Sequence, residues 1–579
     1  MSILLVTTAL KKTWKNDKDL LFLGEWCKLY SDKILLKSIN HSTIEYHWED
    51  RKKFISDCEY LKDINERLIS DISVILNKYH HVDFSIKYWR VVIGPWLAIF
   101  IPAIWDRWES VRVAYTQHNF ENVCASDLKN YKFAMYDYGD SMSSLQEDEW
   151  NYAAFSQIIR HQYSNKCKII NVGAKLKVRE SKSYKKNIPC LFDKFFALFQ
   201  KNYKVVFVKS YLNMWALFKI SLRLRQLPRK FCQFNNFPPP KKMLIGDRSL
   251  SLDLDCKNDF ENFLSLNLFE HIPYNYLEGF ESLYKKADKL KFRGDIIFTA
   301  NAHFSDDFFK VWCAKQIEIK KSKFLISSHG GGIPSLMSSF SNYEEKVSDQ
   351  KIVWHKPIAK KHVRVSSNKH VGRFRLKNIQ GLDITIVSLD LGRYSYGAQS
   401  GPSSSLILED FNQKLNFIKN IPYELQQYTK IFPYPVSPWN FQQRFSDVFG
   451  KKIISKFKDF NEAISSSRII VCTYPQTTFS SAMISGTPTI LLYDKRYWEL
   501  SPEFDDLISI LEKAKILFTN YELAANHVSS VFDNVDKWWE SKLTIEARNK
   551  FLSDCVHIDE DWVSEWSLFF NKLSTPQKA

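Results

Sequence analysis

Two short stretches of the chain carry residue types that bind phosphate and other anionic groups. In the first, four hydroxyl side chains follow Gln476 where a turn becomes a helix: Thr477, Thr478, Ser480 and Ser481. Free N–H groups and the positive end of the helix dipole attract an anion at such a position, and the hydroxyls add donors. A purely structural helix with a Ser/Thr-rich start has the same composition, so both interpretations stay open here.

The second stretch is Ser-Ser-His-Gly-Gly-Gly at residues 327–332, directly after an apolar run that predicts a buried strand at residues 323–327. The imidazole of His329 then lies at the carboxyl end of that strand, and we predict a catalytic role for it. Three glycines, Gly330, Gly331 and Gly332, let a ligand approach main-chain N–H groups closely. The chain has only 17 glycines, which favours a function here over a flexible loop with a surface histidine.

Further polar residues follow other predicted strands. Ser388, Arg393 and Tyr394 come after the strand predicted at residues 383–388, and a guanidinium group can bind phosphate with two parallel hydrogen bonds. An ion pair with a helix is the structural alternative for Arg393. Glu499 follows the strand predicted at residues 489–493, where its carboxylate can accept ribose hydroxyls. Together with the two stretches above, these residues form the predicted donor-binding set.

The first half of the chain carries residues suited to an acceptor. Glu25 and Asp106 are carboxylates beside aromatic residues, whose faces often pack on sugar rings. Burial beside Trp26 would raise the pKa of Glu25 and suit it to general base catalysis, which makes it the second predicted catalytic residue. Pairing with lysine or arginine is the alternative for such carboxylates. The predicted acceptor-binding residues are Trp26, Asp106, Arg107, Asn301 and His303.

Alternating strands and helices must bring these residues together. An apolar strand at residues 469–472, a helix at 479–484 closed by Gly486, and a strand at 489–493 form one βαβ unit. The same alternation in both halves predicts an α/β fold with two doubly wound Rossmann-like domains facing across a cleft, in which ligands bind beyond the strand ends. The predicted boundaries are 1–365 for an acceptor-side domain with helical insertions, 366–530 for a donor-binding domain, and 531–579 for helices that cross back to the first domain.

Composition narrows the class of protein. At 579 residues the chain is too long for one core, and a net charge of +17 favours an anionic partner. The ten cysteines are scattered without metal-ligand spacing, which predicts reduced thiols, no metal and a cytoplasmic location. Residues 91–105 are apolar but short of a bilayer span, and they predict a buried helix pair. Basic runs without regular aromatic interleaving argue against a nucleic-acid partner, and we expect no cofactor.

Several motifs together resemble a family of large transferases found in bacterial O-antigen and capsule gene clusters. They are LVTTALKKTW, FLGEWCKLY, YHWEDR, YWRVVIGPW with DRW, NAHFSDDFFKVW, SSHGGG and TILLYDKRYWEL, and they extend from residue 4 to about residue 500. FLGEWC and HGGG are specific in combination. One departure is Ser328, which stands where the family pattern leads us to expect glutamine before His-Gly-Gly-Gly.

The resemblance implies a metal-independent GT-B glycosyltransferase, similar to retaining transferases of nonulosonic acids such as pseudaminic acid. Its donor would be a CMP-activated sugar bound by the second domain, and its acceptor a lipid-linked glycan. A CDP-polyol phosphotransferase and a non-catalytic glycan- or membrane-binding protein are the alternatives. Such an enzyme is expected to be peripheral on the inner membrane, and a predicted basic amphipathic helix offers cations for an anionic surface: Lys219, Arg223, Arg225 and Arg229.

Overall fold

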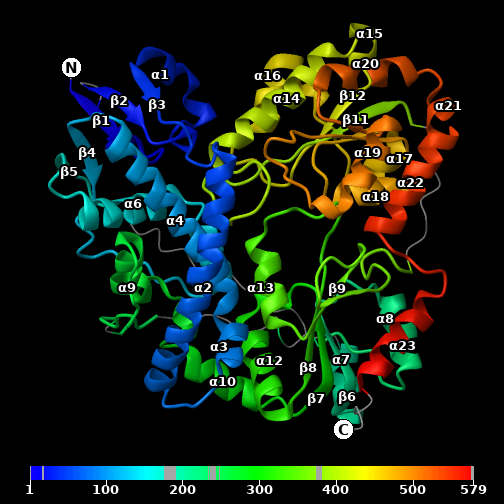
Figure 1. The fold of residues 1–579 in the computed structure, drawn as a ribbon, viewed down its shortest axis with the longest axis horizontal. Helices are drawn as coiled ribbons and strands as arrows, with labels where there is room; N and C mark the ends of the chain where they lie inside the picture. Colours follow the sequence, from blue (N-terminus) through cyan, green and yellow to red (C-terminus); the bar gives the residue numbers. More distant parts are fainter. Residues whose placement is uncertain are drawn as a thin grey trace.

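The residues that the structure describes form three separate parallel sheets of five strands each (Figure 1). A computed structural model describes residues 2–15, 18–174, 191–231, 234, 243–246, 248–372 and 381–574. The basic stretch at 175–186 and the proline-rich stretch at 237–242 lie outside the described residues. In Figure 1 the first sheet (blue to cyan) lies at the upper left, the second (green) at the lower right and the third (yellow to orange) at the upper right.

The first sheet is built from the N-terminal apolar segments in the order β3-β2-β1-β4-β5. Its strands are β1 (Ile3–Val6), β2 (Asp19–Phe22), β3 (His41–Thr43), β4 (Asn122–Ala125) and β5 (Lys168–Asn171). A long helical excursion separates β3 from β4 and opens with α2 (Arg51–His80), whose first N–H groups are capped by the Asp50 carboxylate. Helix α6 (Asp148–Gln162) then packs against β4.

Helices α3 (Ile86–Val92) and α4 (Gly94–Gln117) form the predicted buried helix pair, bent by 67°. Ile99, Ile101 and Ile104 of α4 have no exposed surface, so the apolar run is part of the core. Among the described residues, no single helix is long and apolar enough to cross a membrane, and this bent pair is the one combination that would suffice by length and composition.

The second sheet follows chain order without interruption, β10-β9-β8-β7-β6. Its strands are β6 (Asn202–Val208), β7 (Arg293–Thr299), β8 (Lys323–Ser327), β9 (Gln350–Val353) and β10 (His362–Arg364). Helix α8 (Met214–Arg223) follows β6, α12 (Asp307–Lys320) joins β7 to β8, and α13 (Ser339–Val347) joins β8 to β9. Short helical crossovers of this kind keep successive strands parallel.

The third sheet has the order β12-β11-β13-β14-β15. Its strands are β11 (Asp383–Val387), β12 (Thr429–Phe432), β13 (Ser467–Cys472), β14 (Thr489–Leu492) and β15 (Leu517–Phe518). Helix α18 (Thr477–Ser485) is the crossover between β13 and β14. It ends at Gly486, whose φ of 80° lies in the left-handed region that favours glycine, as the sequence predicts.

The last helix of the described chain, α23 (Trp562–Ser574), returns to the second sheet after α22 (Lys542–Cys555) has packed on the third. Trp566 and Phe570 are buried, and their rings lie 5.5 and 5.7 Å from the ring of Phe298 on β7. The second and third sheets are therefore joined twice, once through the chain between β10 and β11 and once through this returning helix.

The α/β class with parallel sheets is confirmed, and one detail differs from the sequence prediction. Residues 1–365 hold two sheets instead of one. Strands β9 and β10 are the last two strands before the domain boundary predicted after residue 365. They are four and three residues long, and strands this short carry too little apolar periodicity to be read from the sequence.

Because the fold contains buried histidines, we expect acid to lower its stability, and a variant of His527 can test this expectation. Burial lowers its pKa to about 4, with a smaller contribution from Lys515, and its ring packs against Phe518 and Trp538. The unfolded chain then binds more protons between about pH 6.5 and 4, so stability is lost as the pH falls through this window. The free energy of unfolding that is lost between pH 7 and pH 5 should be about 2 kcal/mol smaller in His527→Phe than in the parent.

Melting temperatures at pH 7 and pH 5 provide the measurement. The difference between the two should be smaller in His527→Phe than in the parent, and unchanged in the control His118→Gln, which replaces a part-exposed histidine. An equal pH dependence in His527→Phe and the parent would contradict the proton linkage.

Candidate active site

The loop after β8 crosses from the second sheet to the third. We call residues 328–339 the crossing segment. Ile333 N–H donates to the Pro475 carbonyl (3.1 Å), Leu336 N–H to that of Glu499 (2.9 Å) and Ser339 N–H to that of Ala398 (2.9 Å). These three acceptors lie in the loops after β13, β14 and β11, at the carboxyl edge of the third sheet. The crossing segment is thus held by main-chain hydrogen bonds to that edge.

The histidine–glycine stretch and the start of α18, which the sequence places in different domains, meet directly. Gly331 N–H donates to Thr477 Oγ1 (3.1 Å), and Ser480 Oγ donates to the Gly331 carbonyl (2.8 Å). A Cβ atom at Gly330 would lie 2.4 Å from Thr477 Oγ1, and one at Gly332 only 2.2 Å from the Pro475 carbonyl oxygen. The glycines therefore permit close approach of another part of the chain, whereas the sequence suggests approach of a ligand.

The N-terminus of α18 keeps features of an anion site. Its N-cap residue Gln476 makes no side-chain capping hydrogen bond. Thr478 Oγ1 is buried near the Cys472 thiol and the Tyr474 hydroxyl, and it makes no well-formed hydrogen bond to the described residues. Ser481 Oγ lies 3.2 Å from His370 Nε2. Backbone N–H groups and an unpaired hydroxyl at the positive end of a helix dipole are suited to a phosphate group.

His329 lies at the exposed end of a buried charged network. Its ring is 6.5 Å from Phe304, whose neighbour His303 is fully buried and 3.1 Å from the Glu344 carboxylate. Burial would raise the pKa of Glu344, but Lys351 (3.0 Å) and His303 outweigh burial and lower that pKa to about 2. Burial also lowers the pKa of His303. A buried histidine held by a carboxylate supports the strand ends and does not face an acceptor.

Arg393 and Tyr394 are bound to the first-sheet domain. Arg393 Nη2 and the Tyr394 hydroxyl donate to the two carboxylate oxygens of Asp148 (2.5 and 2.6 Å), at the start of α6. Arg393 Nη1 donates to the Trp26 carbonyl (2.6 Å). The structural alternative for Arg393, an ion pair with a helix, is therefore realised. Ser388 is buried at the end of β11, and its hydroxyl has no partner in the described part of the chain.

The two remaining carboxylates predicted for donor binding and base catalysis also have partners. Glu499 accepts from Arg51 Nε (2.6 Å) and Nη2 (3.0 Å), a bidentate pair between α2 and the loop after β14. Glu25 accepts from Lys28 Nζ (2.6 Å), and its side chain is 33% exposed. Its own N–H donates to Ser405 Oγ (3.1 Å), which places it where the first and third sheets meet. Glu25 remains accessible, whereas Glu499 is occupied by Arg51.

Trp26, Asp106 and Arg107 lie in the interior and present no surface to an acceptor. Trp26 is 1% exposed, and its indole N–H donates to the Thr7 carbonyl (3.0 Å). Asp106 accepts from Tyr46 and faces His47, while Arg107 donates to Asp106, to Asn151 and to the Ser395 and Leu145 carbonyls. This burial corrects the prediction of acceptor contacts for all three. Asn301 is part-exposed, 3.3 Å from the Tyr211 hydroxyl.

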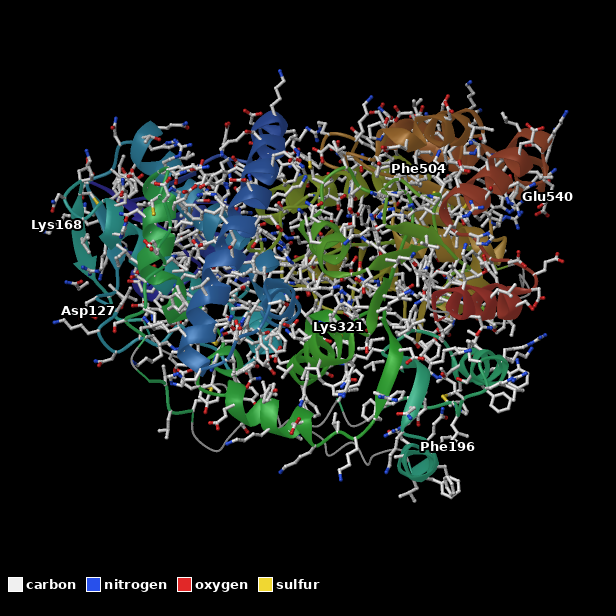
Figure 2. All side chains as sticks on the ribbon, turned by 60° about the horizontal axis from the view of Figure 1, so that its bottom comes forward. Asp127, Lys168, Phe196, Lys321, Phe504 and Glu540 are labelled. Carbon is white, nitrogen blue, oxygen red and sulfur yellow. The ribbon has the colours of Figure 1, made fainter. Side chains whose placement is uncertain are left out.

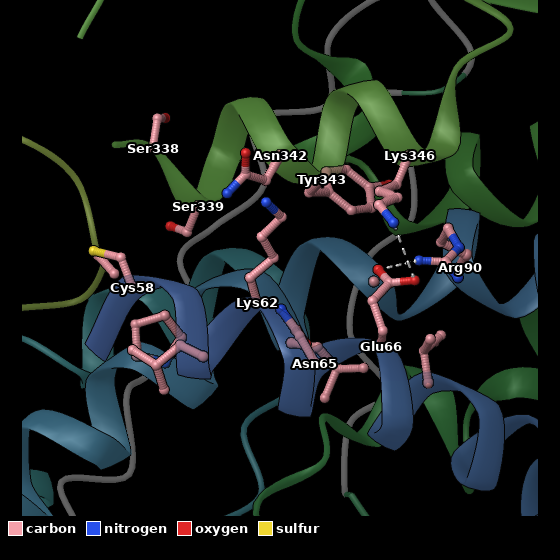
Figure 3. A pocket seen from close by; sticks show the side chains of 16 residues that line it. Cys58, Lys62, Asn65, Glu66, Arg90, Ser338, Ser339, Asn342, Tyr343 and Lys346 are labelled. Atoms are coloured by element: carbon pink, nitrogen blue, oxygen red, sulfur yellow. Dashed lines mark hydrogen bonds and ion pairs between the residues drawn. The ribbon is translucent and has the colours of Figure 1, made fainter. Parts of the chain in front are cut away.

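A separate cavity lies beyond the far end of the crossing segment, between α2, α3, α4 and α13 (Figure 3). It encloses about 50 Å³ and is lined by Ser338 and Ser339 among others. Figure 3 shows Lys62, Arg90 and Lys346 around it, with Glu66 paired to Arg90 (2.7 Å) and 3.8 Å from Lys346. None of its lining residues was predicted from the sequence, because they are scattered over four helices. The described residues hold no cluster of three or more His, Cys, Asp or Glu side chains placed for a metal ion.

Comparison with known proteins gives one match along nearly the whole chain. A family model described as LIC12162 family transferase matches residues 3–570. No curated protein matches. MurG from Acinetobacter baumannii is 11% identical, covering 64% of this chain and 100% of its own, with a TM-score of 0.31. The α,α-trehalose 6-phosphate synthase from Burkholderia multivorans is 10% identical, covering 51% and 76%, with a TM-score of 0.28. These two likenesses are too low to carry a conclusion.

The contact between the crossing segment and the third sheet predicts that Gly332→Ala destabilises the fold. The added Cβ meets main-chain atoms of Pro475 and Gln476 within 3.0 Å, and main chain cannot move aside as a flexible side chain does. We expect a loss on the order of 1–3 kcal/mol, as for other overpacked sites. Thermal unfolding measures it, with Gly246→Ala as control because no atom lies within 4 Å of its added Cβ. Equal melting temperatures for the two variants would contradict the contact.

Proposed function

The chain belongs to the LIC12162 family of transferases, and from this premise we propose that it is a glycosyltransferase. Its donor in this proposal is a CMP-activated nonulosonic acid of the pseudaminic-acid kind, and its acceptor is a lipid-linked glycan of capsule or O-antigen synthesis. The reaction takes place in the cytoplasm. The bond between the anomeric carbon and the phosphate oxygen breaks, and CMP leaves with the electron pair. A new bond forms between the anomeric carbon and the acceptor oxygen, whose proton passes to a base.

One observation carries this proposal: the crossing segment meets the start of α18 at the carboxyl edges of two parallel sheets. A CMP-sugar has a single phosphate, and this junction offers one helix N-terminus, the unpaired hydroxyl of Thr478 and the exposed imidazole of His329. Ligands of open α/β sheets bind beyond the strand ends. The residues fit a nucleotide monophosphate better than a longer polyphosphate, which requires a larger set of cations.

Charge grows on the donor phosphate as the glycosidic bond breaks. Donors aimed at that phosphate stabilise the transition state more than the bound substrate, which is the condition for a faster chemical step. In this scheme the N–H groups of α18 and Thr478 hold the phosphate in all states. His329 donates a hydrogen bond to the oxygen that becomes more negative. Glu25, accessible beside Lys28, is the second candidate for acid–base work, at the junction of the first and third sheets.

His329→Ala tests the catalytic role. Losing one hydrogen-bond donor to developing charge costs on the order of 3 kcal/mol of barrier, a rate loss near a hundredfold. Because His329 is exposed, the melting temperature should stay at the parent value. Turnover of CMP-pseudaminic acid, with CDP-glycerol assayed in parallel, gives the measurement. Parent-level turnover in His329→Ala would show that the loop is structural, and turnover of CDP-glycerol alone would identify a polyol phosphotransferase.

Thr478→Val tests the phosphate site. The change removes a buried hydroxyl while keeping the shape of the side chain, so the fold should tolerate it. A hydrogen bond to a charged group contributes about 1.5–3 kcal/mol, so CMP should bind at least tenfold more weakly. Thr478→Ser keeps the hydroxyl and serves as the control in calorimetric titrations. If Thr478→Val binds CMP as tightly as Thr478→Ser and the parent, the phosphate does not lie at α18.

A further inference from the structure

Helix α8 carries two apolar faces, and the described residues cover only one of them. Ala216, Leu217 and Ile220 are buried, and the helix packs against α23. A second row, Met214, Phe218 and Leu222, is spaced by four residues and therefore lies on one side of the helix. These three side chains are 51%, 45% and 66% exposed. A structural helix needs only its covered face, so the exposed row calls for a different explanation.

Helix α7 (Leu191–Phe199) adds a second exposed apolar group. Phe195, Leu198 and Phe199 are 55%, 77% and 69% exposed, and the rings of Phe195 and Phe199 lie 4.8 Å apart. Helices α7 and α8 flank β6 in the chain and lie at the same end of the molecule (Figure 1). Figure 2, in which Phe196 is labelled, shows α7 projecting outward at that end. Large exposed apolar groups of this kind mark interaction surfaces.

Cations border the exposed row of α8. Trp215, Lys219 and Arg223 form the neighbouring row, with Lys219 Nζ 4.8 Å from the Trp215 ring centroid. Arg225 and Lys230 follow the helix and are exposed. Asp561, directly before α23, offsets part of the charge of Arg223: hydrogen bonds from Ser564 lower the pKa of that carboxyl most, and Arg223 adds to the lowering.

Arg229 does not belong to this surface. It is 7% exposed and its Nε lies 3.1 Å from the Asp193 carboxylate, so it ties the start of α7 to the chain after α8. The basic surface expected from the sequence is therefore corrected to Lys219, Arg223 and Arg225, with Lys230 added.

We propose that the exposed faces of α7 and α8 dock on an anionic lipid bilayer. Phenylalanine and leucine side chains enter the boundary between headgroups and acyl chains, Trp215 lies at the headgroup level, and the bordering cations face anionic headgroups. A row of apolar side chains flanked by lysine and arginine is the pattern that binds such a surface. The docking does not depend on which donor sugar the protein uses.

Sedimentation of the full chain with vesicles tests the docking without any nucleotide. The parent should sediment with vesicles containing phosphatidylglycerol and far less with pure phosphatidylcholine. The double variant Phe218→Ser, Leu222→Ser should lower the partition constant at least tenfold, and Lys219→Gln with Arg225→Gln should lower it roughly fivefold for each cation removed. All four side chains are outside the core, so the melting temperature should not change.

The matched control is Val448→Ser with Leu523→Ser, which removes two apolar side chains of similar exposure, 51% and 61%, from helices on the third sheet. This control should bind vesicles as the parent does. The proposal would be overturned if the double variant Phe218→Ser, Leu222→Ser bound vesicles as strongly as the parent does. The proposal would also be overturned if the parent did not bind vesicles but formed a dimer, and the double variant did not form it. The surface would then be a protein interface.

Discussion

The structure depends on the close contact between the crossing segment and the turn before α18. A Cβ atom at residue 332 would lie 2.2 Å from the Pro475 carbonyl oxygen, so the second and third sheets can approach this closely only through glycine. The hydrogen bonds from Ile333 and Leu336 then extend the contact along the carboxyl edge of the third sheet. This contact brings His329 and the free end of α18 to one place, and the proposed phosphate site rests on it.

Charged pairs between distant parts of the chain hold the first sheet against the same edge. Arg393 and Tyr394 both donate to the carboxylate of Asp148, and Arg51 donates two hydrogen bonds to the carboxylate of Glu499. Removing one partner of a mostly buried ion pair strongly destabilises the fold, because the other charge is then left without compensation. These pairs therefore fix the position of the first sheet more than they add to net stability. The loops that carry the candidate site are thus supported from two sides.

The sequence predicts local secondary-structure elements well, but it does not predict which distant side chains contact each other. The βαβ unit around α18, its closing Gly486 and the strand before His329 follow from apolar runs and turn residues, which are local signals. Asp148 lies 245 residues from Arg393 and Arg51 lies 448 residues from Glu499, so no local pattern could show that these side chains satisfy each other. For the same reason Trp26 and Arg107, which look suited to a sugar acceptor by type, are interior residues. Strands as short as β10 also leave no periodic signal.

Hydrogen–deuterium exchange with and without CMP shows whether the crossing segment and α18 bind the nucleotide together, because it reports which main-chain N–H groups the nucleotide protects. We expect increased protection in two segments together, residues 328–339 and residues 477–481, which follow strands of different sheets. Thr478→Val should reduce the effect in both. Protection confined to other parts of the chain, for example the residues around the α2–α13 cavity, would contradict the claim that the crossing segment and α18 form the phosphate site.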